Sequence, residues 1–319
     1  MEQKSVLIGM SGGVDSSVAA ALLKEQGYHV IGATMRLWTY SDSCNMKHEG
    51  CCAESAVEDA RRVCDKLGID FYVMNFKDMF KDKVVDYFVD EYIHGRTPNP
   101  CIACNKYLKF DALLKKALAM GIDYVATGHY AKIEKGEDGK YILRASEAVK
   151  KDQSYVLYNF TQEQLAHTLM PLGGYNKDWV RQKAEELGLG VAHKPDSQEI
   201  CFVEDDDYAK FITDYSGYKP KEGDILDVNG NVIGKHRGLI YYTIGQRKGI
   251  GAYGRPMFVM KIDAENNTIT LGEKGMEFSN ELTAYDVNFV SGEFPKENML
   301  ITAKVRYQAP PAAAMLCPQ

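Results

Sequence analysis

Three absences limit what this 319-residue chain can be. No window approaches the roughly 18 uninterrupted apolar residues that a membrane-spanning helix needs. The first residues, MEQKSVLIG, enter a strand-like run at once and leave no room for the segments of a signal peptide. Basic residues are not in excess, because 38 Lys and Arg stand against 44 Asp and Glu. This balance argues against a non-specific polyanion binder. We therefore expect a cytoplasmic protein without a membrane partner.

The eight cysteines do not indicate a structural disulfide framework, because the cytoplasm keeps thiols reduced. Some of them should be reactive or bound to metal, and others should belong to the core. Cys64 falls on the apolar stripe of a helix that we expect from about Glu54 to Gly68, so we predict that it is a core residue.

The first two-thirds of the chain alternate short β-rich runs with amphipathic segments of helical length. Strands are expected at Ser5–Met10, His29–Met35, Phe71–Asn75 and Tyr124–Thr127, and helices at Ser16–Gln26, Glu54–Gly68, Asp78–Ile93 and Phe110–Ala119. Such alternation is typical of βαβ units, and it predicts an α/β fold with a doubly wound parallel sheet.

The pattern changes to strands and turns beyond about residue 208. An Asn229-Gly230 turn indicates a hairpin, and a second hairpin is expected farther along. The expected strands are Asp224–Val228, Asn231–Gly234, Phe258–Ile262, Thr268–Leu271, Val287–Val290 and Ile301–Tyr307. We predict a catalytic domain over residues 1–208, a small central β domain over 209–277 and a C-terminal β-barrel-like module over 278–319. No closing strand is evident in this last module, so it is expected to be incomplete.

The first expected strand runs directly into a glycine turn and the start of a helix. Such a turn directs backbone N–H groups and the positive end of a helix toward one point, which suits a phosphate group. The loop lacks the lysine of the GxxxxGK[ST] pattern. That absence fits attack at the α-phosphorus with pyrophosphate as the leaving group, and Asp15 would help to position Mg²⁺. The alternative is an ordinary helix N-cap with glycines for packing.

Two cysteine-bearing segments are candidates for sulfur chemistry. One is GRTPNPCIACNK, residues 95–106, and the other is DSQEICF, residues 196–202. A cysteine near a helix N-terminus and lysines has a lowered thiol pKa, which yields a nucleophilic thiolate.

Seven segments that occur in order along the chain resemble the tRNA-specific 2-thiouridylase family, which uses the PP-loop of the N-type ATP pyrophosphatases. The resemblance covers essentially the whole sequence. The segments are GMSGGVDSS, GRTPNPCIACN, ATGHYA, KDQSYVLY, SQEICF, GLIYYTIGQRKG and VRY.

The resemblance implies an enzyme that adenylates the wobble uridine of tRNA with ATP and then replaces its C2 oxygen with sulfur. It implies Cys104 as the nucleophile and Cys201 as the carrier of a persulfide. The implied ATP-binding residues are Gly9, Met10, Ser11, Gly12, Gly13, Val14, Asp15, Ser16, Met35 and Gly128. The residues implied to face the target base or tRNA are Asn99, Pro100, Cys101, His129, Lys151, Asp152, Gln153, Arg306 and Tyr307.

The sulfur route stays open, because this chain has Cys101 where some family members have aspartate. In one scheme a cysteine desulfurase or a relay protein loads Cys201 with a persulfide, and a Cys104–Cys201 disulfide remains after transfer. In the other, Cys101, Cys104 and Cys201 hold an iron–sulfur cluster with one open iron. Zinc is a third alternative, although no second C-x2-C pair exists.

Other features carry weaker expectations. Cys44, His48, Cys51 and Cys52 have the types of metal ligands but are expected to form an ordinary loop, and no role is assigned to Cys317. Two rival functions are a PP-loop ligase for a small metabolite and a non-catalytic, metal-dependent RNA-binding protein. The first lacks catalytic cysteines, and the second would not need the SGGVDS loop.

Overall fold

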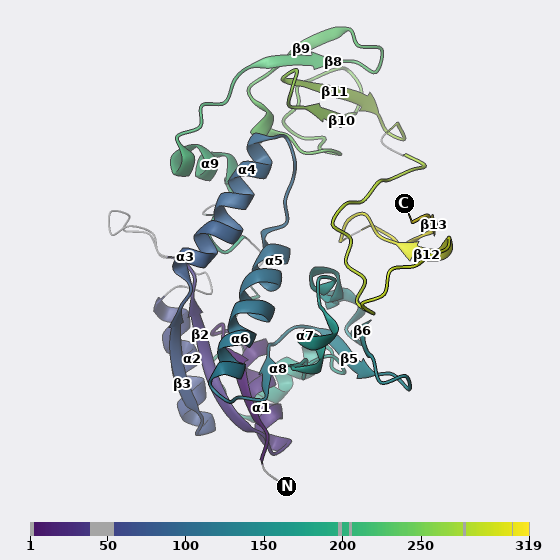
Figure 1. Ribbon diagram of the computed structural model, residues 1–319. Coiled ribbons are helices and arrows are strands. Elements are labelled where there is room, and N and C mark those ends of the chain that lie inside the picture. Colours follow the sequence, from purple (N-terminus) through teal and green to yellow (C-terminus); the bar gives the residue numbers. More distant parts are fainter. Residues whose placement is uncertain are drawn as a thin grey trace.

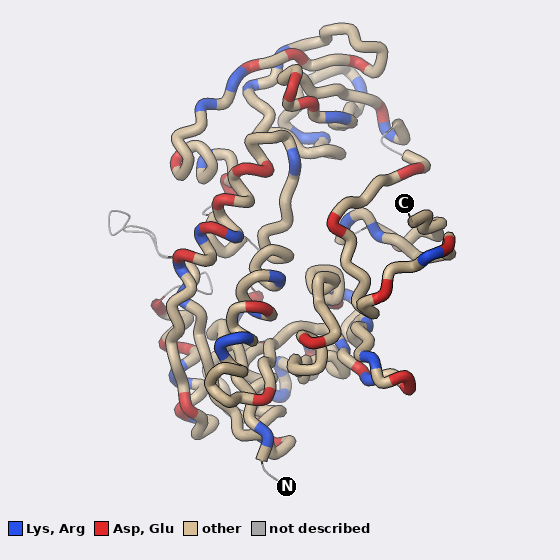
Figure 2. The backbone as a smooth tube through the Cα atoms, viewed as in Figure 1, with Lys and Arg blue, Asp and Glu red and all other residues tan. Residues whose placement is uncertain are grey.

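The computed structural model describes residues 3–38, 54–196, 200–203, 206–276, 279–307 and 309–318. A parallel sheet with its covering helices lies at one end, and long helices connect it to a four-stranded β module at the other (Figure 1). The last two strands form a separate small sheet. Basic and acidic residues are interspersed in the parallel-sheet part and in the β module alike (Figure 2). The cluster formed by Cys44, His48, Cys51 and Cys52 lies outside the described residues.

The parallel sheet has the strand order β3-β2-β1-β4-β7, and all of its neighbouring strands are parallel. The strands are β1 (Ser5–Gly9), β2 (His29–Arg36), β3 (Asp70–Asn75), β4 (Tyr124–Ala126) and β7 (Thr168–Leu169). Side chains alternate between its faces: Leu7 enters one core cluster, whereas Val6 and Ile8 enter the other. All three are completely buried, which confirms the predicted α/β sheet.

One face of the sheet is covered by α1 (Val14–Glu25), α2 (Glu54–Leu67) and α8 (Lys177–Glu186) (Figure 1). Cys64 is fully buried in this layer, which confirms that it is a core residue. The other face is covered by two long helical segments. They consist of α3 (Lys77–Phe80), η1 (Lys81–Asp86) and α4 (Tyr87–Ile93), and of α5 (Pro100–Ala103), η2 (Cys104–Ala112) and α6 (Leu113–Ala119).

The second of these helical segments begins about ten residues earlier than predicted. The side chain of Asn99 caps it by accepting a hydrogen bond of 3.0 Å from the backbone N–H of Cys101, and Pro100 occupies the first helical position. Cys101 and Cys104 therefore lie on a helix and not in a loop before it. The sequence did not predict this cap, because the prolines at positions 98 and 100 suggested an irregular segment before the helix.

Several short elements connect β4 with α8. A hairpin of β5 (Ala131–Lys135) and β6 (Tyr141–Ala145) was not predicted, because charged residues interrupt its apolar alternation. The other connecting elements are η3 (Val149–Lys151), η4 (Ser154–Leu157) and α7 (Gln162–Ala166).

The β module follows α9 (Tyr208–Ser216) and has the strand order β10-β11-β8-β9. Both predicted hairpins are present, and a parallel contact between β11 and β8 joins them. Val259, Ile269 and Leu271 are completely buried in its core. Its elements are β8 (Gly223–Leu226), β9 (Val232–His236), η5 (Leu239–Tyr241), β10 (Met257–Asp263) and β11 (Thr268–Glu273).

The C-terminal part is a two-stranded antiparallel sheet of β12 (Met299–Ala303) and β13 (Ala312–Leu316). The strand expected at Val287–Val290 is wrong, because these residues form a loop. The Asn288 side chain anchors that loop by donating to the carbonyl oxygens of Tyr158 and Phe160. Among the described residues, no helix is long and apolar enough to cross a membrane.

Candidate active site

A cavity of about 660 Å³ lies at the carboxyl ends of β1, β2 and β4. This is the edge of an open α/β sheet at which ligands bind. Every residue of the predicted nucleotide loop, Gly9 to Ser16, lines the cavity. Met35 and Gly128, the other two predicted ATP-binding residues, line it as well.

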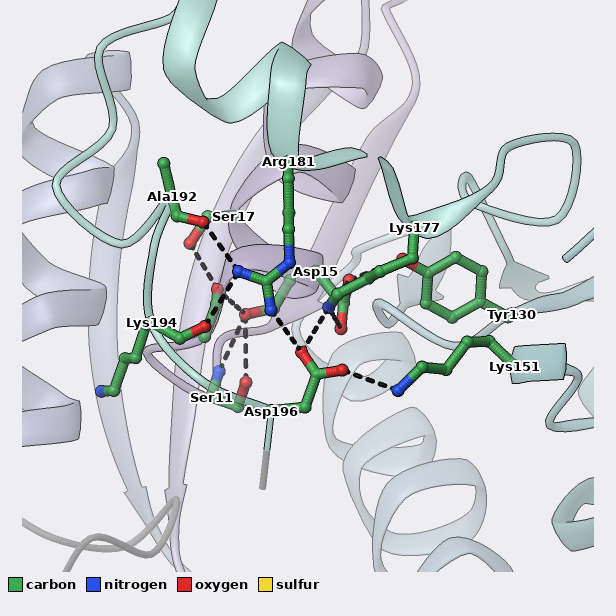
Figure 3. Close-up of polar contacts among 12 residues, drawn as sticks. Ser11, Asp15, Ser17, Tyr130, Lys151, Lys177, Arg181, Ala192, Lys194 and Asp196 are labelled. Carbon is green, nitrogen blue, oxygen red and sulfur yellow. Dashed lines mark hydrogen bonds and ion pairs between the residues drawn. The ribbon is translucent and has the colours of Figure 1, made fainter. Parts of the chain in front are cut away.

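The nucleotide loop is held in a tight conformation by its own hydroxyl groups (Figure 3). Ser16 Oγ accepts a hydrogen bond of 3.2 Å from the backbone N–H of Ser11, and Ser17 Oγ donates to the carbonyl oxygen of Gly13 at 2.8 Å. Gly12 has a φ of +70° and packs directly on the backbone of Ala56 in α2. The glycines therefore allow the close packing that places the N-terminus of α1 at the cavity.

Gly128 brings β4 equally close to the loop. A Cβ atom at this position would lie 2.7 Å from the backbone nitrogen of Ser16, so a side chain cannot be accommodated without movement. The next residue, His129, is hydrogen-bonded through Nδ1 to Thr127 Oγ1 at 2.7 Å. Desolvation, together with the charge of Lys109, holds the pKa of His129 well below its usual range. His129 is therefore neutral near pH 7.

Six of the residues predicted to face the target base or tRNA share the cavity with the nucleotide loop: Asn99, Cys101, His129, Lys151, Gln153 and Tyr307. Three others do not line it. Pro100 is buried, Asp152 accepts hydrogen bonds from Ser146 and Ser154, and Arg306 donates to the carbonyl oxygen of Ile244.

The three candidate cysteines have different surroundings. Cys101 is exposed and lines the cavity, whereas Cys104 is buried and Cys201 is exposed, and neither of these two lines it. Cys104 and Phe202 belong to the same hydrophobic cluster, so the segment that carries Cys201 packs on the core containing Cys104.

These cysteines do not form a metal site in this arrangement. All three are described by the structure, and among the described residues no group of three or more His, Cys, Asp or Glu side chains is placed to hold a metal ion. The geometry therefore does not fit a cluster held by Cys101, Cys104 and Cys201 together. The Asp15 carboxylate contacts the ammonium group of Lys177, so it would hold Mg²⁺ only after Lys177 moves.

A polar network that was not predicted from the sequence lies beside the nucleotide loop (Figure 3). Lys177 Nζ lies 2.8 Å from both carboxylate oxygens of Asp15 and 2.7 Å from Asp196 Oδ1. Asp196 also contacts Lys151 at 2.7 Å and Arg181 at 3.2 Å. The partners come from α1, η3, α8 and the segment after it. Asp15, Lys151 and Asp196 lie in segments that the sequence singles out, whereas Lys177 and Arg181 lie in none of them.

Two of these groups have shifted pKa values. Burial acts to raise the pKa of Asp196, but hydrogen bonds from Lys151 and Lys177 outweigh it and lower the pKa to about 2. Burial and the charge of Asp15 raise the pKa of Tyr130, whose hydroxyl donates to Asp15 at 2.7 Å. The Asp196 carboxylate is therefore ionised at neutral pH, and Tyr130 is a neutral hydrogen-bond donor.

The fold and the cavity define a nucleotide-binding α/β enzyme domain of the PP-loop class, followed by a β module. The family model described as "tRNA methyl transferase HUP domain" matches residues 4–205, and the one described as "tRNA methyl transferase PRC-barrel domain" matches residues 209–273. A relative from Acetivibrio thermocellus named tRNA-specific 2-thiouridylase MnmA is 58% identical, with coverage of 100% of this chain and 89% of its own. A relative of the same name from Clostridioides difficile is 59% identical over 98% of this chain and 87% of its own. The chain belongs to the tRNA-specific 2-thiouridylase family.

Solved structures show a weaker likeness. A 4-thiouridine synthetase–RNA complex with bound ATP is 19% identical, covers 60% of this chain and 43% of its own, and has a TM-score of 0.39. This likeness adds nothing to the family assignment.

Proposed function

We propose that this protein binds ATP and a tRNA with a wobble uridine, adenylates the uridine C2 oxygen and replaces that oxygen with sulfur. The observation that carries the proposal is the shared cavity, in which the nucleotide loop and Cys101, Asn99 and His129 line one space. A uridine held beside the N-terminus of α1 would place its C2 oxygen near the α-phosphorus of ATP. A base must leave its stack to enter such a pocket.

Adenylation is required because the C2 carbonyl is a poor electrophile and its oxygen a poor leaving group. The uridine oxygen attacks the α-phosphorus, an O–P bond forms, and the bond to the β-phosphate breaks with release of pyrophosphate. The backbone N–H groups of the loop, with Ser11 and Ser16, would stabilise the developing phosphate charge. Neutral His129 would contact the base or the sugar without adding charge.

We propose the persulfide route for sulfur transfer. The terminal sulfur of a Cys201 persulfide attacks C2, and AMP leaves with the original oxygen. Cys104 thiolate then attacks the Cys201 sulfur, so that 2-thiouridine is released and a Cys104–Cys201 disulfide forms. A thiol reductant resets the pair, and a cysteine desulfurase or a relay protein supplies the next sulfur to Cys201.

This route requires the Cys201 segment to move toward the cavity, because neither Cys104 nor Cys201 lines it. Two observations support it. Cys201 is exposed, as a group loaded by another protein must be, and its segment packs on the core that contains Cys104. No step is assigned to an iron–sulfur cluster, because the three cysteines are not gathered as ligands. Asp15 would be free to hold Mg²⁺ on the phosphates of ATP only when Lys177 turns away from it.

The experiment separates the two half-reactions. Purified protein is incubated with ATP, a tRNA transcript bearing a wobble uridine, cysteine and a cysteine desulfurase, and both pyrophosphate and 2-thiouridine are measured. We expect Cys201→Ser to keep tRNA-dependent pyrophosphate release and to lose 2-thiouridine formation. Cys317→Ser is the matched control, because Cys317 is also exposed but lies near the end of the chain.

The outcomes are distinct. If wild-type protein releases no tRNA-dependent pyrophosphate, the proposed adenylation is wrong. If Cys201→Ser forms 2-thiouridine as well as Cys317→Ser does, the persulfide route is wrong while the adenylation stands.

A further inference from the structure

Lys177 is the cation of the polar network that pairs with Asp15, in the first turn of α1. Lys194 also reaches the loop, but its ammonium group is held by the carbonyl oxygen of Gly12 at 3.1 Å and by Asp59 at 2.9 Å. Lys177 lines the cavity, and its side chain is only 12% exposed. Its contacts with the two oxygens of Asp15 and with Asp196 can use all three N–H donors of an ammonium group. These contacts hold the ammonium group of Lys177 beside the nucleotide loop.

The two carboxylates do not depend on Lys177 alone. Asp196 keeps Lys151 and Arg181 as partners when Lys177 turns away, and Asp15 keeps the hydroxyl of Tyr130. An incoming phosphate can therefore attract Lys177 without leaving either of these half-buried carboxylates without a hydrogen-bond partner, which would be costly. This redundancy distinguishes Lys177 from a cation in an isolated ion pair.

The nucleotide loop itself supplies no positive side chain. Its backbone N–H groups and hydroxyls can surround a phosphate, but a departing pyrophosphate concentrates several negative charges that lysine commonly balances. We infer that Lys177 binds the β- and γ-phosphates of ATP and the pyrophosphate formed from them, so that it supplies the cation the loop lacks. This inference rests on the proposed function. Asp15 and Asp196 act as positioning residues that hold the ammonium group in place before ATP binds.

A purely structural role for Lys177 makes a different prediction. If Lys177 only ties α8 to α1, its loss disturbs the site as a whole and weakens ATP and AMP binding alike. A β/γ-phosphate contact instead affects ATP and pyrophosphate but spares AMP, which lacks those phosphates. The ratio of the ATP affinity to the AMP affinity therefore distinguishes a phosphate-binding role of Lys177 from a purely structural one.

The test measures binding of ATP, AMP and pyrophosphate to the full chain by isothermal titration. Lys177→Gln removes the charge and keeps a hydrogen-bond donor. We expect its ATP and pyrophosphate affinities to fall about 10- to 100-fold, the range of one charge-assisted hydrogen bond, and its AMP affinity to change less than about twofold. Lys183→Gln is the matched control, because Lys183 lies on the same helix and pairs with Glu25 away from the cavity. It should bind all three ligands as the wild type does.

Equal losses for ATP and AMP, or no loss for either, would overturn the inference. If Lys177→Gln does not fold, the comparison moves to Asp15→Asn and the double variant Asp15→Asn/Lys177→Gln, in which the ion pair is removed as a unit. Asp15→Asn should still bind ATP more tightly than AMP, whereas the double variant should lose this preference. An equal preference for ATP over AMP in the two variants would refute the inference. Failure of the wild type to bind ATP would instead contradict the proposed function.

Discussion

The conformation of Gly12 leads to a sharp prediction about the nucleotide loop. Its φ of +70° lies in the left-handed region, where an alanine costs about 1–2 kcal/mol. A Cβ atom would also overlap the carbonyl oxygen of Ala56 and lie 2.9 Å from the carbonyl carbon and Cα of that residue. Because these are backbone atoms of α2, no side-chain rotation can relieve the overlap. We therefore expect Gly12→Ala to destabilise the domain by more than the backbone term alone.

The measurement is a thermal melt without nucleotide, with Gly13→Ala as the matched control. The backbone term alone corresponds to about 2–8 °C in a domain of this size, at roughly 2–4 °C per kcal/mol. Gly13 has a φ of −103°, and a Cβ atom there would be 3.4 Å from its nearest neighbour, Ser11 Oγ. Its substitution should cost no more than the change of N-cap residue, about 1 kcal/mol or less. Equal melting temperatures for the two variants would refute the packing of the loop on α2.

Two further predictions concern titrating groups. Burial raises the pKa of the Cys64 thiol to about 12, so iodoacetamide at pH 8 should modify Cys101 and Cys201 in the native protein but spare Cys64, as peptide mass spectrometry can check. Rapid native labelling of Cys64 would contradict its burial. The pKa of Asp196 is lowered to about 2 from 3.8, so its ion pairs stabilise the fold above about pH 4, and this contribution is lost as the pH falls toward 2. The melting-temperature difference between wild type and Asp196→Asn should therefore shrink between pH 5 and pH 3, and a constant difference would show that the Asp196 charge contributes nothing.

Local patterns in the sequence were sufficient for the core of the fold. The apolar run of β1 and the glycines that follow it predicted both the central strand and the turn into α1, since each depends on neighbouring residues. The Asn229-Gly230 turn likewise predicted the β8–β9 hairpin. These features could be predicted because the residues that determine them lie within about ten positions of one another.

The predictions failed where the local structure depends on residues far away in the sequence. β13 consists largely of alanine, a weak strand former, and exists because it pairs with β12. The reverse holds at Val287–Val290, where β-forming residues form a loop that is anchored by Asn288 on distant carbonyl groups. Lys177 was missed for the same reason, because its partner Asp15 is 162 positions away.

The contrast between Cys104 and Cys201 bears on the order of sulfur transfer. A persulfide donor is itself a protein, so it can reach the exposed Cys201 but not a thiol with 8% exposure inside a hydrophobic cluster. Loading both cysteines would consume sulfur without producing a thiolate to release the product. In the proposed route, burial of Cys104 would therefore protect the resolving thiol until the Cys201 segment approaches the adenylated base. Asp196, five positions before Cys201, contacts Lys177 beside the nucleotide loop. The network proposed to bind pyrophosphate therefore also holds the start of the segment that would deliver sulfur in this route.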